Sequence, residues 1–187
     1  MIEIKTLVIV PAFNEEESIK KVVKEIKENN NNIDVVVVND GSKDNTLIEA
    51  KASGAIVLDL PYNLGIGGAV QSGYLYAYDI AIQIDGDGQH DSKYIPVMEN
   101  YIKNEKYDMV IGSRFIKKTK YEQTFMRMLG NKILYFLIKL FTGKKIYDTT
   151  SGFRAVNRDL IKRFSENYPY DYPEPDTNLQ VLLLNKK

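Results

Sequence analysis

Two uninterrupted runs of apolar, mostly β-branched residues constrain the fold of this chain more than any other feature. Ile4–Val10 is nearly all apolar, and Ile33–Val38 repeats the pattern further along. A strand with one solvent-facing side alternates apolar and polar residues, whereas a strand covered on both faces reads as a continuous apolar run. The two runs therefore predict central strands of a parallel sheet with helices on both faces.

The rest of the chain continues the alternation of strands and helices. Residues 15–29, which follow the first run, place apolar side chains at helical spacing, and three more strand-like segments alternate with helical ones up to residue 113. The pattern predicts a doubly wound, mostly parallel α/β sheet. The expected strands are Ile4–Val10, Ile33–Val38, Ala55–Leu60, Ile80–Asp85 and Met109–Gly112, and the expected helices are Glu15–Asn29, Asp44–Ser53, Gly67–Tyr78 and Ser92–Asn104.

The length of 187 residues suits a single domain. Residues 114–187 nevertheless differ from the first part, because the regular alternation of strands and helices stops there. We expect a long helix at Tyr121–Phe141, a short strand within Asp148–Val156, a helix at Asn157–Phe164, an irregular loop at Tyr168–Pro175 and a helix at Thr177–Asn185. Residues 1–113 hold 18 acidic against 10 basic side chains, and residues 114–187 hold 7 against 15. The basic half suggests an anionic partner or a solvated basic face.

Composition narrows the setting in which the chain works. With no cysteine, a disulfide framework and a thiolate metal site are excluded. No apolar run reaches the ~18 residues that a membrane-spanning helix needs, and the N-terminus shows no signal-peptide pattern. We expect a cytoplasmic protein.

Polar residues interrupt the chain where the predicted strands end, which is where open α/β sheets bind ligands. Asn14-Glu15, Asn39-Asp40, Asp85-Gly86-Asp87 and Ser113-Arg114 follow the first, second, fourth and fifth strands. Any one of them can be an ordinary turn, but together they predict one ligand-binding edge of the sheet.

The segment Asp85-Gly86-Asp87-Gly88-Gln89-His90 carries the strongest local signal. Residues i and i+2 of an extended chain point the same way, so both carboxylates can face one cation. Such oxygen ligands suit Mg²⁺ or Mn²⁺ completed by substrate phosphates. A surface turn remains an alternative, whereas a calcium-binding EF-hand loop is excluded because His90 and Pro96 stand where it needs Gly and Glu. His90, the only histidine, can be structural or part of the site.

Two other nucleotide-binding patterns fail. Gly65-Ile66-Gly67-Gly68 opens a predicted helix, but Val70 stands where a dinucleotide fingerprint needs its third glycine. We expect Asn63–Gly73 to pack the start of a helix against the site instead. A nucleotidyltransferase needs a Gly-rich basic loop after the first strand, and Pro11–Glu15 supplies none.

Six motifs occur in the order found in glycosyltransferase family 2, and the chain most resembles the dolichyl- or polyprenyl-phosphate sugar synthase branch of that family. They are Val10-Pro11-Ala12-Phe13-Asn14-Glu15, Val38-Asn39-Asp40-Gly41-Ser42, Asn63-Leu64-Gly65, Asp85–His90, Gly112-Ser113-Arg114-Phe115 and Thr150-Ser151-Gly152-Phe153-Arg154. The resemblance implies a Rossmann-like GT-A fold and an inverting transfer from a UDP- or GDP-sugar, with 1–113 as the nucleotide-sugar-binding half and 114–187 as the acceptor-side half.

The resemblance also implies roles for individual residues. The nucleotide sugar would contact Pro11, Phe13, Glu15, Val38, Asp40, Asp85, Gly86, Asp87, Gln89 and Arg114; the metal, Mg²⁺ or Mn²⁺, would be held by Asp85, Asp87 and Gln89; Ser151 and Arg154 would line the acceptor side. The catalytic candidates are Asp87, Arg114, Asp148 and Asp176. If the acceptor is a hydroxyl, a carboxylate must take its proton. The candidates for this general base are Asp148, Glu174 and Asp176, and the sequence does not favour one over the others.

The acceptor carries the open alternatives. The resemblance favours a polyprenyl phosphate over a saccharide hydroxyl, and we expect no nucleic-acid partner. The apolar stripe and lysines of Tyr121–Phe141 fit a helix at an anionic membrane surface, on its inner face, or a helix packed on the core. Relatives commonly continue past Asp176 with a further helix and strand. We therefore expect an incomplete acceptor half with Leu182–Leu184 uncovered, and a second hypothesis is a nucleotide-sugar-binding module with little transfer activity.

Overall fold

Both apolar runs form strands at the centre of one sheet, as the sequence predicts. The structure, a computed structural model, describes residues 4–30, 32–76, 78–113, 136, 139–140, 143, 146 and 148–187. Its strands are β1 (Thr6–Ala12), β2 (Asp34–Asn39), β3 (Ile56–Asp59), β4 (Ile80–Gln83), β5 (Met109–Ile111) and β6 (Arg154–Asn157). They lie in the order β3-β2-β1-β4-β6-β5, with β1 parallel to both neighbours. The order reverses between β1 and β4, and that is where an open sheet binds its ligand.

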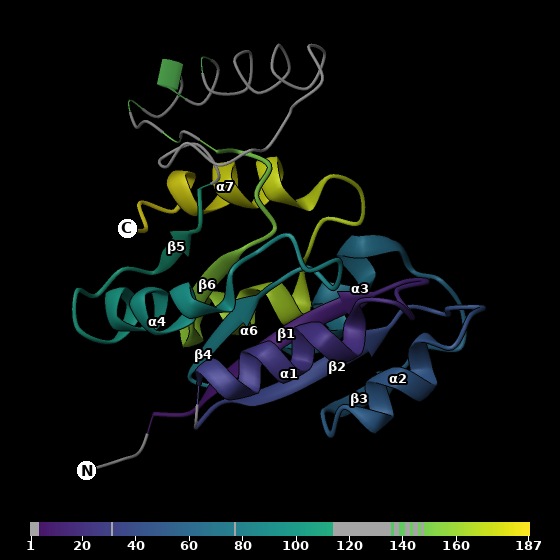
Figure 1. The fold of residues 1–187 in the computed structure, drawn as a ribbon. Coiled ribbons are helices and arrows are strands. Elements are labelled where there is room, and N and C mark those ends of the chain that lie inside the picture. The colour runs from purple at the N-terminus through teal and green to yellow at the C-terminus, as the bar shows by residue number, and fades with distance from the viewer. Residues whose placement is uncertain are drawn as a thin grey trace.

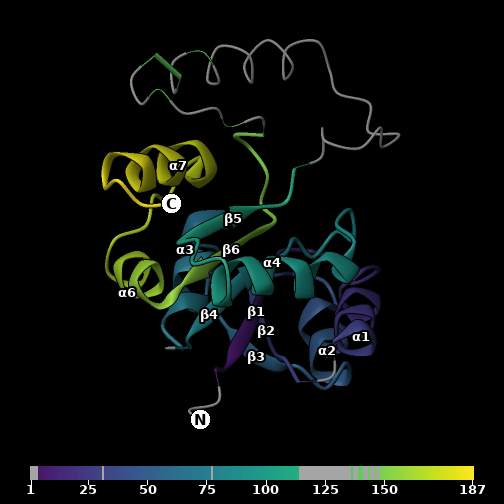
Figure 2. The same ribbon diagram turned by 90° about the vertical axis from the view of Figure 1, so that its left-hand side faces the viewer.

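Helices cover both faces of this sheet (Figure 1). They are α1 (Ile19–Asn29), α2 (Thr46–Ala52), α3 (Gly65–Tyr74), the short 3₁₀ helix η1 (Ser92–Tyr94), α4 (Ile95–Lys103), α6 (Arg158–Glu166) and α7 (Pro173–Leu183). Turning the molecule by 90° shows α1 and α2 on one side of the strands and α6 and α7 on the other (Figure 2). The result is the predicted α/β fold in three layers.

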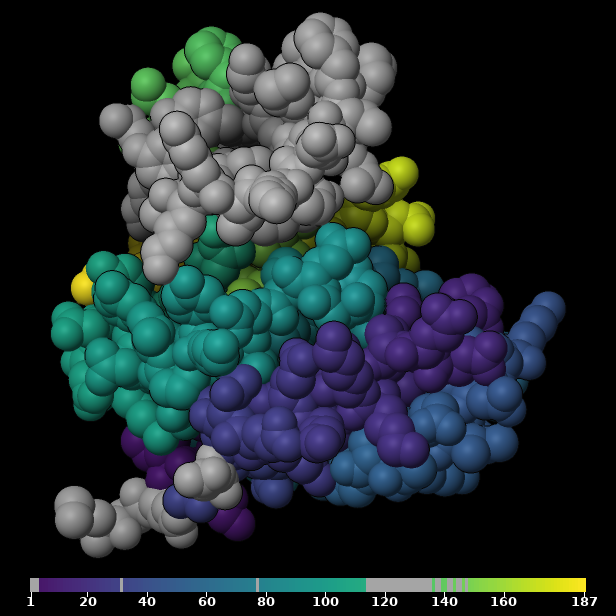
Figure 3. Space-filling model, viewed as in Figure 1, coloured from purple at the N-terminus to yellow at the C-terminus, as the bar shows by residue number. Residues whose placement is uncertain are grey.

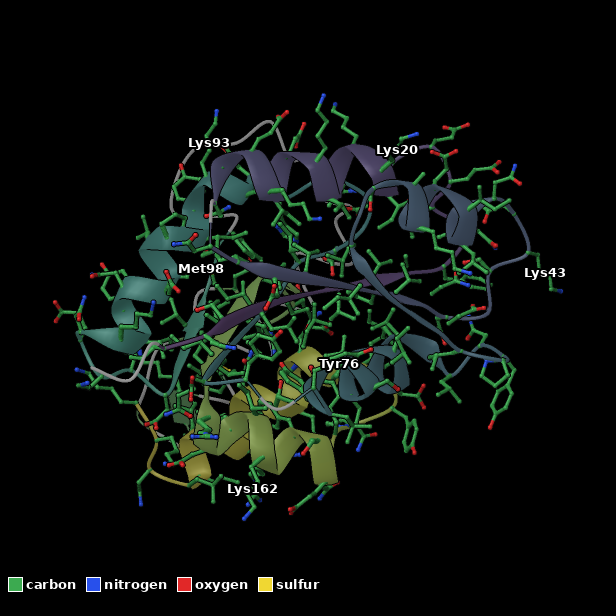
Figure 4. The ribbon with its side chains drawn as sticks, turned by 90° about the horizontal axis from the view of Figure 1, so that it is seen from below. Lys20, Lys43, Tyr76, Lys93, Met98 and Lys162 are labelled. Carbon is green, nitrogen blue, oxygen red and sulfur yellow. The ribbon has the colours of Figure 1, made fainter. Side chains whose placement is uncertain are left out.

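Two apolar clusters hold the layers together. The first joins one face of the strands to α1, α2 and α4 through buried residues such as Ile26, Ala50 and Met98. The second joins the other face to α3, α6 and α7, with Val70, Phe164 and Val181 among its members. Helices of the first cluster, α1 and α4 among them, form the near face in Figure 3. Figure 4 shows Met98 and Tyr76 on opposite sides of the sheet. Burial on both faces explains why β1 and β2 read as continuous apolar runs.

The edge of the sheet differs from the prediction. Met109–Gly112 was expected to continue the parallel series, but β6 lies between β4 and β5 and runs antiparallel to both. Strand β6 comes from the second half of the chain, so the two halves share one sheet. Two antiparallel steps restore the direction of β5, and its end therefore still points to the edge where the sequence predicts a ligand.

The last helix begins earlier than the sequence predicts. Residues 168–175 were expected to form an irregular loop, but α7 starts at Pro173. Proline is tolerated in the first turn of a helix because the N–H groups of that turn have no acceptor within the helix, so the N–H that proline lacks is not needed there. Beyond α7, Lys187 accepts hydrogen bonds from the amides of Asp108 and Met109, beside β5. Leu183 and Leu184 are exposed, at 66% and 40%, as expected, whereas Leu182 is half-buried.

Candidate functional site

A hollow of about 470 Å³ opens at the carboxyl ends of β1, β2 and β4, beside the start of α3. Four separate motifs contribute to its walls. The lining residues are Pro11, Ala12, Phe13, Glu15, Asp40, Asn63, Gly65, Ile66, Ala69, Asp85, Gly86 and Asp87. The structure thus brings together seven of the predicted nucleotide-sugar residues in one place: Pro11, Phe13, Glu15, Asp40, Asp85, Gly86 and Asp87.

The loop after β1 is fastened to the loop after β2. The amide of Glu15 donates to the hydroxyl of Thr46 at 2.7 Å, and the amide of Asn14 donates to the Ser42 hydroxyl at 3.0 Å. In return, the amide of Lys43 donates to the Asn14 side chain at 2.9 Å. These bonds hold Phe13 and Glu15 in fixed positions at the rim, and a binding site is more effective when its residues are held in place before the ligand arrives.

Asp40 ties the second strand to the start of α3. Its side chain is almost fully buried, and its Oδ1 accepts a hydrogen bond from the amide of Leu64 at 2.7 Å. Gly41 follows with φ +67°, and a Cβ there would lie 2.7 Å from the backbone of Tyr62 and Asn63. Only glycine suits that conformation and that approach. The prediction that the Asn63–Gly73 segment packs against the site is therefore confirmed.

Asp85 and Asp87 are the two carboxylates of the hollow. The Asp85 side chain is 34% exposed, and Asp87 is exposed with its Oδ1 accepting from the amide of Gln89 at 2.9 Å. No three histidine, aspartate or glutamate side chains gather into a metal cage within the described part of the chain. Two hard carboxylates in a hollow open to a ligand nevertheless fit Mg²⁺ or Mn²⁺, which commonly complete their shells with water and substrate phosphates.

His90 lies behind Asp85, a position that sequence reasoning left open. Its Nε2 is 3.1 Å from Oδ2 of Asp85, and its side chain is only 7% exposed. The ring lies against Phe153, with centroids 5.3 Å apart. The spacing of five residues between Asp85 and His90 offered no sequence signal for this contact, because a turn has to reverse the chain between them.

Two predicted donor residues, Val38 and Gln89, do not line the hollow, and a third cannot be placed against it. Val38 is completely buried in the second apolar cluster, so its side chain faces the core and not the hollow, and its expected contact with the nucleotide stays a prediction. Gln89 is exposed but is not part of the lining. Arg114 lies outside the described residues.

The predicted acceptor-side residues are mostly buried. Ser151 and Arg154 have no exposed surface, so their side chains are packed inside the protein, and their expected place on the acceptor side stays a prediction. The Ser151 hydroxyl donates to the carbonyl of Gly112 at 2.7 Å. Asp148 is 1% exposed, while Asp176 is exposed in the first turn of α7. Neither carboxylate lines the hollow.

Arg154 instead organises the space between β6 and α7. Its guanidinium donates to the carbonyl of Ser151 at 2.8 and 3.2 Å and to the Thr177 hydroxyl at 2.5 Å. Burial raises the pKa of the neighbouring Tyr168 to about 12, and the positive charge of Arg154 opposes that rise. The buried charge is thus held by neutral acceptors.

The predicted helix Tyr121–Phe141 falls almost wholly outside the described residues, which include only 136, 139 and 140 of it. Phe136 and Leu140 are exposed, at 61% and 64%. Among the helices that the structure describes, none combines the length and the apolar character needed to cross a membrane.

Comparison with known proteins adds a family to this geometry. The family model described as Glycosyl transferase family 2 matches residues 7–164. An uncharacterized protein of Methanocaldococcus jannaschii is 36% identical, over 94% of this chain and 74% of that protein. A dolichyl-phosphate beta-glucosyltransferase of Trichomonas vaginalis is 35% identical, over 85% of this chain but only 55% of that enzyme.

Other relatives carry names of the same kind. The UDP-N-acetylglucosamine–dolichyl-phosphate N-acetylglucosaminyltransferase of Methanococcus voltae is 33% identical over 84% of this chain and 71% of the enzyme. Among solved structures, glucosyl-3-phosphoglycerate synthase of Mycobacterium tuberculosis, in complex with Mn²⁺ and UDP-glucose, aligns with a TM-score of 0.68 at 25% identity. That alignment covers 83% of this chain and 57% of the synthase, so the likeness extends to little more than half of it.

Proposed function

The chain belongs to glycosyltransferase family 2, and we propose that it is an inverting enzyme that moves a sugar from a UDP- or GDP-sugar to a polyprenyl phosphate. The observation that carries this proposal is the single hollow shared by Phe13, Asp40, Asp85 and Asp87. It offers an aromatic face, a buried carboxylate and two exposed or half-exposed carboxylates within one rim.

The donor site divides into two ends. Phe13, which is 45% exposed, and Asp40 both line the hollow, and an aromatic ring with a carboxylate suits the flat base and the hydrogen-bonding groups of a nucleoside. Asp85 and Asp87, from the loop after β4, supply the end that would meet the diphosphate. Two carboxylates alone would repel that diphosphate, so a divalent cation between them is the physical requirement of this arrangement.

Asp85 and Asp87, with Gln89 nearby, would hold Mg²⁺ or Mn²⁺. Such an ion, when bound, neutralises the negative charge that develops on the departing nucleoside diphosphate. The mycobacterial synthase, whose structure holds Mn²⁺ and UDP-glucose, supports a divalent cation in such a site. Gly86 helps to shape the bottom of the site, where a Cβ would lie 3.0 Å from the carbonyl of Pro11.

The named relatives that act on dolichyl phosphate support a lipid phosphate as acceptor. A phosphate is already anionic at pH 7 and needs little help from a general base. A saccharide hydroxyl does need one, and the described candidates lie outside the hollow: Asp148 is buried, while Glu174 and Asp176 lie on α7. The lipid phosphate is therefore the better fit, and it would place the protein at the cytoplasmic face of a membrane.

The decisive experiment is transfer of a radiolabelled sugar from UDP- and GDP-sugars to polyprenyl phosphate, with a soluble saccharide as the second acceptor. Labelled polyprenyl product supports the proposal. Donor binding without transfer to either acceptor would support the second hypothesis, a nucleotide-sugar-binding module. A thermal-shift panel separates the two donors, because a ligand present at 100 times its Kd stabilises the folded protein by about 2.7 kcal/mol.

Asp87→Ala tests the site within this proposal. Asp87 is exposed, so the variant should fold normally and lose the metal dependence of UDP or GDP binding. Glu28→Ala removes another exposed carboxylate, on α1 and not in the lining of the hollow, and should bind like the wild type. Isothermal titration with and without Mn²⁺ measures both. Unchanged metal dependence in Asp87→Ala would show that the metal assignment is wrong.

A further inference from the structure

The carboxylate of Asp85 lies between two groups that the proposed reaction does not use directly, Gly152 and His90. We propose that these two are positioning residues, which hold the Asp85 carboxylate in the orientation that binds the divalent cation. The inference rests on the metal role proposed above for Asp85.

The carboxylate of Asp85 occupies the space that a side chain at residue 152 would need. A Cβ on residue 152 would lie 2.6 and 2.7 Å from the two oxygens of Asp85 and 3.0 Å from its Cγ. These are the three nearest atoms, and all belong to Asp85. The φ of Gly152 is outside the positive range, so its backbone does not require glycine. The absence of a side chain at this position therefore serves the carboxylate.

The backbone around Gly152 is fastened on several sides. The amide of Gly112 donates to the carbonyl of Phe153 at 2.8 Å, in addition to the bond from Ser151 to Gly112. From α7, the side chain of Asn178 donates to the carbonyl of Thr149 at 3.1 Å. With this segment held to β5 and α7, an added methyl group would displace the Asp85 side chain more readily than the backbone.

His90 holds the same carboxylate by a hydrogen bond. A carboxylate only accepts hydrogen bonds, so Nε2 of His90 carries the proton and donates to Oδ2 of Asp85. Packing against Phe153, which is itself 4% exposed, restricts the ring. Phe153 follows Gly152 in the chain, so one short segment supplies both the surface under the carboxylate and the support for the ring that fixes it.

Both contacts reduce the orientations available to Asp85 before any ion arrives. Partners that orient metal-binding side chains typically change metal affinity by about 10- to 100-fold when they are removed. We expect Gly152→Ala and His90→Ala to weaken Mn²⁺ binding by about that factor. His90→Gln, which retains a side-chain N–H donor, should recover part of the affinity.

The experiment measures Mn²⁺ affinity by electron paramagnetic resonance in the presence of UDP, together with thermal unfolding of the metal-free proteins. Gly73→Ala is the matched control, because its Cβ would clash with the side chain of Ile9 in the core. That variant should lower the melting temperature and leave Mn²⁺ affinity unchanged. In an Asp85→Asn background, Gly152→Ala should cause no further loss of Mn²⁺ affinity.

The outcomes separate this inference from the proposed function. If Asp85→Asn weakens Mn²⁺ binding while Gly152→Ala and His90→Ala do not, the positioning role is overturned and the metal site stands. If the wild type shows no Mn²⁺ binding with UDP, the metal role and the positioning role both fall. Should Gly152→Ala not fold, His90→Ala and its recovery by His90→Gln decide the point.

Discussion

The two sides of the ligand-binding edge use polar residues in opposite ways. On the β1–β2 side, hydrogen bonds to the side chains of Asn14 and Thr46 lock the loops to each other, and Phe13 and Glu15 remain accessible to a ligand. On the β6 side, Ser151 and Arg154 of the Thr150–Arg154 motif turn inward and have no exposed surface, and neither has Thr177 of α7. The comparison teaches that a polar motif at a sheet edge can serve either the ligand or the scaffold.

Strand direction explains the difference. The chain leaves a parallel strand such as β1 or β2 at the edge and passes out towards solvent. It enters the antiparallel strand β6 from that edge, and α7 covers the entering segment through Thr177 and Asn178. Polar side chains therefore border the hollow in one case and are covered by α7 in the other.

Thr177→Val should give the largest stability effect on the buried side. Valine has nearly the same shape, but it leaves one N–H of the buried Arg154 without an acceptor. A hydrogen bond to a charged group contributes about 1.5–3 kcal/mol. We expect the free energy of unfolding, measured by urea denaturation, to fall by about that amount. Thr177→Ser keeps the hydroxyl and is the control. Equal stability of the Val and Ser variants would break the comparison, since the β6 side would then not be scaffold.

Asp40→Asn tests the ligand-facing side with a smaller effect. The asparagine oxygen still accepts from the amide of Leu64, so the contact between the two loops remains, although weaker, and the loss of unfolding free energy should be smaller than in Thr177→Val. Hydrogen bonds to a charged acceptor are roughly twice as strong as neutral ones, and losing the charge should weaken UDP or GDP binding by about tenfold. Calorimetric titration measures the affinity. A variant with wild-type affinity and reduced stability would place Asp40 with the scaffold.

Asp108 provides the smallest test, at the far end of β5. Burial raises its pKa, but hydrogen bonds from Lys187, Asn157 and Lys186 outweigh that effect and leave the pKa below its usual value of 3.8. A carboxyl whose pKa is lower in the folded state stabilises the protein above the unfolded pKa and loses this contribution as pH falls through the folded value.

Asp108→Asn should therefore cost roughly 0.5–1 kcal/mol near pH 7. The difference from wild type should shrink as the pH falls below about 4. Melting temperatures measured from pH 7 to about pH 3 follow this difference, and nucleotide affinity should remain that of the wild type. A constant difference across the pH range would mean that the contacts to Lys186 and Lys187 contribute through packing and not through charge.

Sequence reasoning was accurate where structure follows from local pattern. The apolar runs of β1 and β2, the helical spacing of α1 and the polar breaks after the strands depend on neighbours a few residues apart, so the chain itself encodes them. The same patterns predicted the hollow with Asp40, Asp85 and Asp87, because carboxyl ends of parallel strands must meet at one edge.

Only the tertiary structure decided the β6 side. Whether Met109–Ile111 pairs with β4 or with a strand more than forty residues later depends on long-range packing. A segment of three residues is too short to show a pattern of apolar and polar residues that would predict its neighbour. The same holds for Val38, Ser151 and Arg154, whose burial follows from what covers them. The contact of Gly152 with Asp85 joins residues far apart in the chain, so no sequence spacing foretells it. Local periodicity sets which segments become strands and helices, but the neighbours of a side chain in the folded protein decide whether it meets ligand or core.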